Sequence, residues 1–115
     1  MGENAILDKS KDFALRIIKL YQYLTEDKRE YVLSKQILRS GTSIGANTRE
    51  AIRGQSKPDF YHKLNVALKE AEESAYWLEL LHESNYIDTK LFNGMNNDCC
   101  EIISLLVSIT KTQKN

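Results

Sequence analysis

A single proline, five glycines, two cysteines and one tryptophan stand in the 115 residues of this chain. With so little proline and glycine, long irregular segments are not expected and regular helices are favoured. No stretch approaches the roughly 18 consecutive apolar residues that a membrane-spanning helix needs. The start of the chain, MGENAILDKS, also lacks the basic and then apolar segments of a secretory signal. The sequence therefore predicts one cytoplasmic domain, covering residues 1–115.

The two cysteines, Cys99 and Cys100, are adjacent in the chain. Neighbouring cysteines rarely form a disulfide, and two cysteines alone cannot build a zinc site. We therefore expect both to be small side chains of a reduced cytosolic core.

An excess of charge of one sign is missing as well, because 16 Lys+Arg balance 16 Asp+Glu. The two halves differ, since residues 1–57 hold 11 Lys+Arg against 7 Asp+Glu (+4) and residues 58–115 hold 5 against 9 (−4). A general nucleic-acid-binding domain is usually clearly basic. Binding of that kind would have to use a local basic surface.

Apolar spacing predicts four amphipathic helices, at about residues 10–26, 31–53, 57–84 and 88–112. We expect Ser10 to cap the first helix, Ser56 or Lys57 to open the third, and Asp88 to cap the fourth. Pro58 falls near the first position of the third helix, where its missing N–H is tolerated. Short links between four such helices imply an all-α, up-down-up-down antiparallel four-helix bundle.

The segment RSGTSIGANTREA, residues 39–51, resembles a phosphate-binding loop in composition only. It has no lysine after its second glycine, and it does not match G-x-G-x-x-G. On a helix, its small residues lie on the face turned to the core. Glycine is unfavourable inside helices, which indicates that these positions need space. We expect Gly41 and Gly45 of the second helix to pack closely against Ala67 and Ala71 of the third.

A basic row follows the outer side of the second helix, within about 80° of arc. Its members are Lys35, Arg39, Arg49 and Arg53. One interpretation is a solvated face whose charges pair with acidic neighbours. The other is a ridge that contacts phosphates, which gains strength if an oligomer repeats it. We expect a polar seam at the flank of this row, bonding across helices or subunits and formed by Ser43, Asn47 and Glu50.

A second apolar strip lies on the third helix, away from its core face and near Glu70 and Glu73. It consists of Val66, Trp77 and Leu80. A tryptophan on such a strip is typical of a subunit interface, although a corner of the bundle could bury it instead. Together with the face of small residues on the second helix, this strip favours a homo-oligomer.

Metal and catalytic sites are not expected. Glu79-x-x-His82 and Asp59-x-x-His62 both belong to the third helix and are separated by about 30 Å. They cannot share one metal ion, and the other helices offer no glutamate pair to complete either motif. No Ser-His-Asp or Cys-His set is present. We therefore expect no enzyme activity, no cofactor, no small-molecule substrate, and a packing role for a partly buried His82.

The run SKQILRSGTSIGANTREAIRGQSKPDFYHKLNVALKEAEESAYWLELL, residues 34–81, strongly resembles a bacterial family. These are the four-helix-bundle proteins encoded in intervening sequences of 23S rRNA genes, often labelled S23 ribosomal proteins. The R-S-G-T-S-I-G-A-N core and the D-F, K-L, K-E and Y-W-L elements stand in family order. The resemblance implies ring-shaped homopentamers. Relatives include the accessory variability protein of diversity-generating retroelements, which acts with a reverse transcriptase and is strongly basic, whereas this chain is neutral.

Two functions follow as hypotheses. The first is a non-enzymatic oligomeric module that binds RNA, or a nucleoprotein partner of the reverse transcriptase type, through Lys35, Arg39, Arg49 and Arg53. The second is a protein-interaction scaffold in which these side chains pair with Glu70, Glu72 or Glu73 of a neighbouring helix or subunit.

Overall fold

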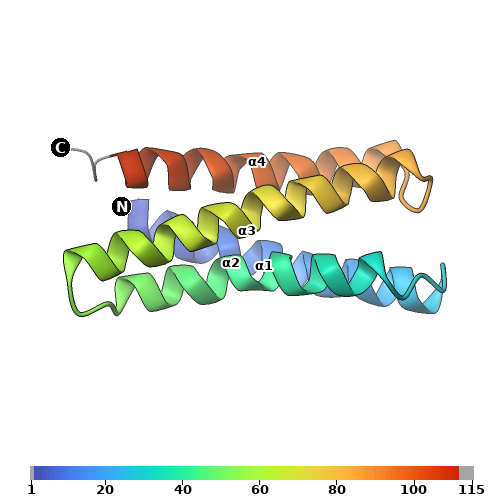
Figure 1. Cartoon of the computed structure of the whole chain (residues 1–115). Coiled ribbons are helices and arrows are strands. Elements are labelled where there is room, and N and C mark those ends of the chain that lie inside the picture. Colours follow the sequence, from blue (N-terminus) through green and yellow to red (C-terminus); the bar gives the residue numbers. More distant parts are fainter. Residues whose placement is uncertain (1, 112–115) are drawn as a thin grey trace.

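The chain forms an antiparallel bundle of four helices in its computed structural model, which describes residues 2–111. The helices are α1 (Gly2–Glu26), α2 (Leu33–Ile52), α3 (Lys57–Glu83) and α4 (Thr89–Lys111). Each helix packs against the next one, and α4 returns to α1 (Figure 1). The predicted four-helix bundle is confirmed, and the proposed end of the fourth helix at residue 112 lies outside the described residues.

One apolar core runs the length of the bundle, and every helix contributes to it. Its largest fully buried side chains are Phe13, Ile6, Ile17, Leu24, Ile37, Ile44, Leu64, Leu78, Leu81, Met95, Ile102 and Leu106. Burial of such side chains, each contributing roughly 1.5–3 kcal/mol, is the main source of stability.

The start of α1 differs from the prediction. Ser10 is a buried residue inside the helix, and its hydroxyl donates to the Leu7 carbonyl at 3.2 Å instead of capping. The helix extends before Ser10 because Ile6 continues the core stripe of Phe13 and Ile17 at helical spacing. The sequence pattern around Ser10 resembles an N-cap, although this serine is a buried residue within the helix.

The other two cap predictions are confirmed. The Ser56 hydroxyl accepts the Asp59 N–H at 3.2 Å at the start of α3, with Pro58 in the first turn. The Asp88 carboxylate accepts the Leu91 N–H at 2.8 Å before α4. Asn85, at φ 68°, reverses the chain between these helices.

Glu30 is a cap that the sequence analysis missed. Its buried carboxylate accepts the N–H groups of Val32, Leu33 and Ser34 at 3.2, 3.0 and 2.7 Å. These are donors at the start of α2 that have no partner within the helix. The Glu30 side chain therefore caps α2, and the Glu30 N–H ties the α1–α2 connection back to the Leu24 carbonyl at 2.8 Å.

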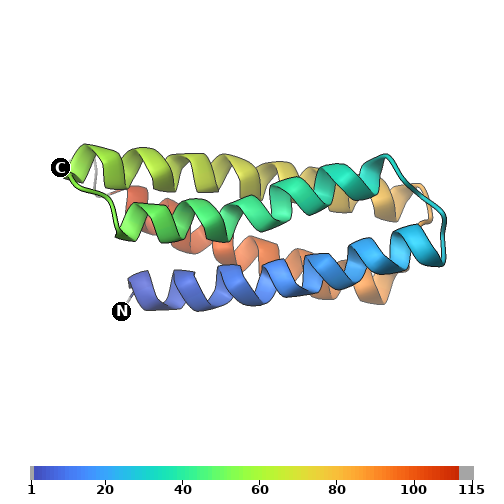
Figure 2. The ribbon, with the colours of Figure 1, turned by 90° about the horizontal axis from the view of Figure 1, so that it is seen from below.

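The glycines of α2 face α1, so the predicted partner helix is wrong. A Cβ on Gly41 would lie 2.7 Å from Cγ1 of Ile17, and one on Gly45 would lie 3.4 Å from Oγ of Ser10. Figure 2 shows α1 and α2 side by side along this seam. The absent side chain at Gly41 lets the two helices approach closely.

Small residues also line the contact between α2 and α3, where Ser40 stands in place of the predicted glycines. The buried hydroxyls of Ser40 and Ser74 share a hydrogen bond of 2.8 Å across this interface. Ala67 and Ala71 are fully buried as predicted, and the Ala71 carbonyl accepts the Cys99 thiol of α4 at 3.2 Å. The interior therefore carries a few polar groups, each with a partner.

Within residues 2–111, no helix is sufficiently long and apolar to cross a bilayer.

Candidate nucleic-acid interface

The basic row of α2 divides between the two neighbouring helices. Arg39 and Arg49 stand at its opposite edges, about 80° apart around the helix. Arg39 turns to α3, where it meets two carboxylates, and Arg49 turns to α1, where it lines a hollow with Leu7 and Lys11. The four side chains therefore do not form one continuous free ridge.

Arg39 forms ion pairs within the chain. Its guanidinium donates to the Glu70 carboxylate at 3.2 Å and also to the Glu73 carboxylate. The indole N–H of Trp77 donates to the same Glu73 oxygen at 2.9 Å. The interpretation of paired charges on a solvated face is confirmed for this arginine.

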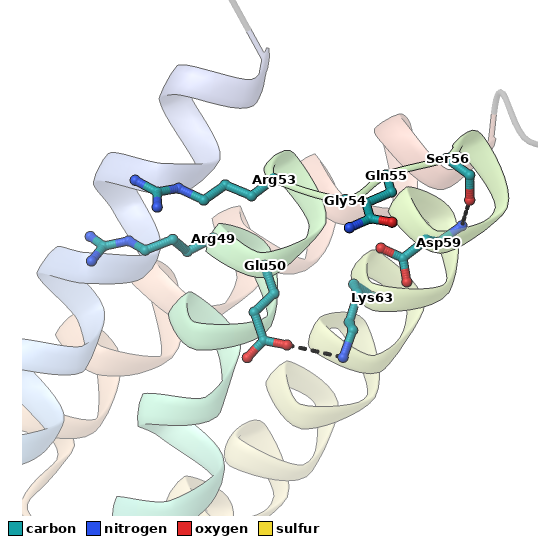
Figure 3. Close-up of a pocket in the computed structure, with 8 residues that line it drawn as sticks. All are labelled: Arg49, Glu50, Arg53, Gly54, Gln55, Ser56, Asp59 and Lys63. Atoms are coloured by element: carbon teal, nitrogen blue, oxygen red, sulfur yellow. Dashed lines mark hydrogen bonds and ion pairs between the residues drawn. The ribbon is translucent and has the colours of Figure 1, made fainter.

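Arg49 and Arg53 remain as exposed cations at the last turn of α2. They extend to the side of α1 in Figure 3 and have no carboxylate partner among the described residues. Their spacing of four residues places them about 6 Å apart along the helix axis. The carbonyl end of a helix carries partial negative charge, which favours arginines there. Both line an open hollow of about 680 Å³ with Gln55, Asp59 and Lys63.

The predicted polar seam connects helices only at Glu50. Its carboxylate pairs with Lys63 of α3 at 3.0 Å (Figure 3), and this hydrogen bond raises the pKa of Lys63. Ser43 donates to the Arg39 carbonyl and Asn47 to the Ser43 carbonyl, so both bond within α2. Within the chain neither residue bonds to another helix, because short side chains reach their own preceding turn more easily, and bonds across subunits stay a prediction.

Lys63 was missed by the sequence analysis. Its positive charge could have indicated a pairing with Glu50. Recognising that pair requires the register between α2 and α3, which the sequence does not give. Lys35, the remaining cation of the predicted row, is exposed at the opposite end of α2 from Arg53.

The strip on α3, formed by Val66, Trp77 and Leu80, is half-buried within the single chain. Trp77 packs on the core and its N–H is satisfied by Glu73. This arrangement favours the bundle-corner interpretation for Trp77. Exposed apolar side chains include Leu15 at 52% and Ile18 at 39% on α1, and Tyr76 at 53%, whose ring centroid lies 5.3 Å from that of Trp77.

The surroundings of Cys99 and His82 are those of packing residues. Cys99 is buried as expected, and burial raises its pKa to about 12, whereas Cys100 is exposed, contrary to the prediction of a core residue. His82 is half-buried and stacks on Phe92 with ring centroids 4.4 Å apart. Within the described part of the chain, no three His, Cys, Asp or Glu side chains gather as a metal site would require.

Comparison with known proteins supplies the family. Residues 2–108 match the family described as 23S rRNA-intervening sequence protein. A crystal structure from Bacteroides thetaiotaomicron, of a protein with unknown function from the S23 ribosomal protein family, is 56% identical with a TM-score of 0.95. The match covers 96% of this chain and 99% of that one. No curated protein matches at a significant level. This chain belongs to the 23S rRNA-intervening sequence protein family.

Proposed function

We propose that the protein is a non-enzymatic module that binds RNA phosphates through the end of α2, with Arg49 and Arg53 as the principal contacts. The observation that carries the proposal is the pair of exposed guanidiniums without a carboxylate partner among residues 2–111. Arginine suits this role because its planar group can donate two hydrogen bonds to one phosphate. Lys11, exposed and beside Arg49, extends the same surface onto α1.

We further propose that the protein acts as a homo-oligomer, with the pentameric ring that its family resemblance implies. One protomer has no net charge, so its general field is weak. Several copies of Arg49 and Arg53 on one face would give a local positive potential that attracts a polyanion. Leu15 and Ile18, exposed on α1, support self-association because neighbouring exposed apolar side chains are common at interfaces.

RNA binding is tested by fluorescence anisotropy with a labelled RNA hairpin at low and moderate salt. The variant Arg49→Gln plus Arg53→Gln should bind more weakly than the wild type. Its matched control is Lys19→Gln plus Lys90→Gln, which removes the same charge from exposed positions of α1 and α4. Equal binding by both double variants, or no binding by the wild type at low salt, would contradict the proposal.

A second candidate function is a protein-interaction scaffold. The contacts of Arg39 with Glu70 and Glu73 favour it, because they show an arginine of the row taking carboxylate partners. Glu72, Glu79 and Glu83 of α3 are exposed and have no ion-pair partner among the described residues. In this alternative, the Arg49 and Arg53 variant should lose assembly in size-exclusion chromatography and leave RNA affinity unchanged.

A further inference from the structure

The contact with α3 occupies Arg39, the member of the basic row that lies at its α3 edge. One guanidinium meets two carboxylates, of Glu70 and Glu73, and Trp77 holds the Glu73 oxygen from the other side. The side chain of Arg39 is 50% exposed, whereas those of Glu70 and Glu73 are 20% and 34% exposed. The two carboxylates are therefore the less exposed partners, and the arginine is the one that faces solvent.

The ion pairs of Arg39 with Glu70 and Glu73 are weak enough for a phosphate to compete with them. An ion pair with an exposed arginine is screened by water and salt and contributes little net stability. A phosphate offers the same guanidinium charge-assisted hydrogen bonds of similar geometry. A polyanion already held near α2 would present such a phosphate at high local concentration. Arg39 can then exchange one anionic partner for another at a small difference in free energy.

We propose that Glu70 and Glu73 act as an internal competitor for nucleic-acid phosphate at Arg39. While the contact is closed, α2 offers Arg49 and Arg53; when it opens, Arg39 joins them. This inference rests on the proposed function, since Arg49 and Arg53 supply the first contact. It assigns to two acidic residues of α3 the role of limiting RNA affinity.

The test compares two double variants of α3 in the anisotropy assay with the labelled RNA hairpin. Glu70→Gln plus Glu73→Gln removes the competitor, and Glu72→Gln plus Glu79→Gln removes the same charge from exposed glutamates without ion-pair partners among the described residues. We expect the first variant to bind roughly twofold to fivefold more tightly than the second. Its dependence of log Kobs on log salt should also steepen by about 0.7–0.9, the contribution of one further phosphate contact. Adding Arg39→Gln to the first variant should cancel both effects.

A single substitution in the otherwise wild-type protein gives an independent measurement. Because Arg39 is occupied by its carboxylates, Arg39→Gln should weaken RNA binding less than Arg49→Gln does. Circular dichroism and thermal unfolding verify that each variant is folded.

The results separate this inference from the proposed function. Equal gains in the two glutamate variants, or a gain that survives Arg39→Gln, would overturn the inference and leave binding through Arg49 and Arg53 intact. So would an equal loss from Arg39→Gln and Arg49→Gln. If the wild type does not bind RNA, the proposed function fails. If the Glu70→Gln plus Glu73→Gln variant then binds, and this binding is lost on adding Arg39→Gln, the result still supports the two glutamates as a competitor. No binding by any variant overturns both.

Discussion

At the scale of single residues, the two glycines of α2 differ in what surrounds them. An added Cβ at Gly41 would lie within 3.0 Å of three carbons of the buried Ile17 side chain. We expect Gly41→Ala to lower the free energy of unfolding by about 1–2 kcal/mol, because overpacking outweighs the gain in helix propensity of about 1 kcal/mol. Urea unfolding followed by circular dichroism measures it.

Gly45→Ala is the matched control, since its Cβ would make an ordinary contact at 3.4 Å with the Ser10 hydroxyl. It should be neutral or stabilise the protein by about 0.5–1 kcal/mol. Gly45→Ala proving more destabilising than Gly41→Ala would contradict the assigned packing. In an Ile17→Ala background, which lacks all three contacted carbons, Gly41→Ala should cost less stability than it does in the wild type.

The two neighbouring cysteines should differ in reactivity. Burial raises the pKa of Cys99 to about 12, so its thiol stays protonated and unreactive at neutral pH, whereas Cys100 is exposed. Iodoacetamide should therefore modify only Cys100 in the folded protein, and both cysteines after denaturation. Mass spectrometry of Cys100→Ser and Cys99→Ser variants identifies the site. Native modification that persists in Cys100→Ser would show that Cys99 is accessible.

The sequence was sufficient to predict which residues would be charged and outward-facing and which would be small and packed, but not which residues they would contact. Arg39 and Arg49 both belong to the outward basic row on a helical projection, yet one meets α3 and the other lies beside α1. Likewise, the small size of Gly41 was informative, but Ile17 as its neighbour depends on the rotation of α2 about its axis. A single sequence does not determine that rotation, because several packings bury a similar apolar stripe.

At the scale of helices, the beginning of α2 depends on Glu30. Glu30→Ala removes the acceptor of three backbone N–H groups from a buried position and should destabilise the fold by about 1–3 kcal/mol. Glu26→Ala, at an exposed site of α1, should change stability by less than about 0.5 kcal/mol. Thermal unfolding of the two variants compares them directly, and equal midpoints would refute the capping role.

The helices themselves were largely predictable because periodic apolar residues fix their existence and number. Ser56 and Asp88 marked two starts correctly, since their side chains have backbone donors three residues ahead. Ser10 misled for a physical reason: a small buried residue under Gly45 has the same chemistry as a cap. Glu30 was missed because a glutamate before a helix usually remains solvated.

At the scale of the molecule, self-association is open to direct measurement. Sedimentation velocity at micromolar concentration should give a mass several times the 13.2 kDa of the protomer, five times in a pentamer. Leu15→Glu plus Ile18→Glu should reduce it without unfolding the bundle, since both side chains are exposed. Gln36→Glu plus Asn93→Asp adds the same charge at exposed polar positions and should have no effect. A wild-type monomer would exclude the proposed ring.

The salt dependence of RNA affinity measures whether Arg49 and Arg53 contact nucleic-acid phosphates. Each lost phosphate contact should lower the slope of log Kobs against log salt by about 0.7–0.9. Arg49→Gln plus Arg53→Gln should therefore have a slope smaller than the wild type by about 1.4–1.8. Lys19→Gln plus Lys90→Gln should keep the wild-type slope. Identical slopes for the wild type and the arginine variant would contradict phosphate contact by Arg49 and Arg53.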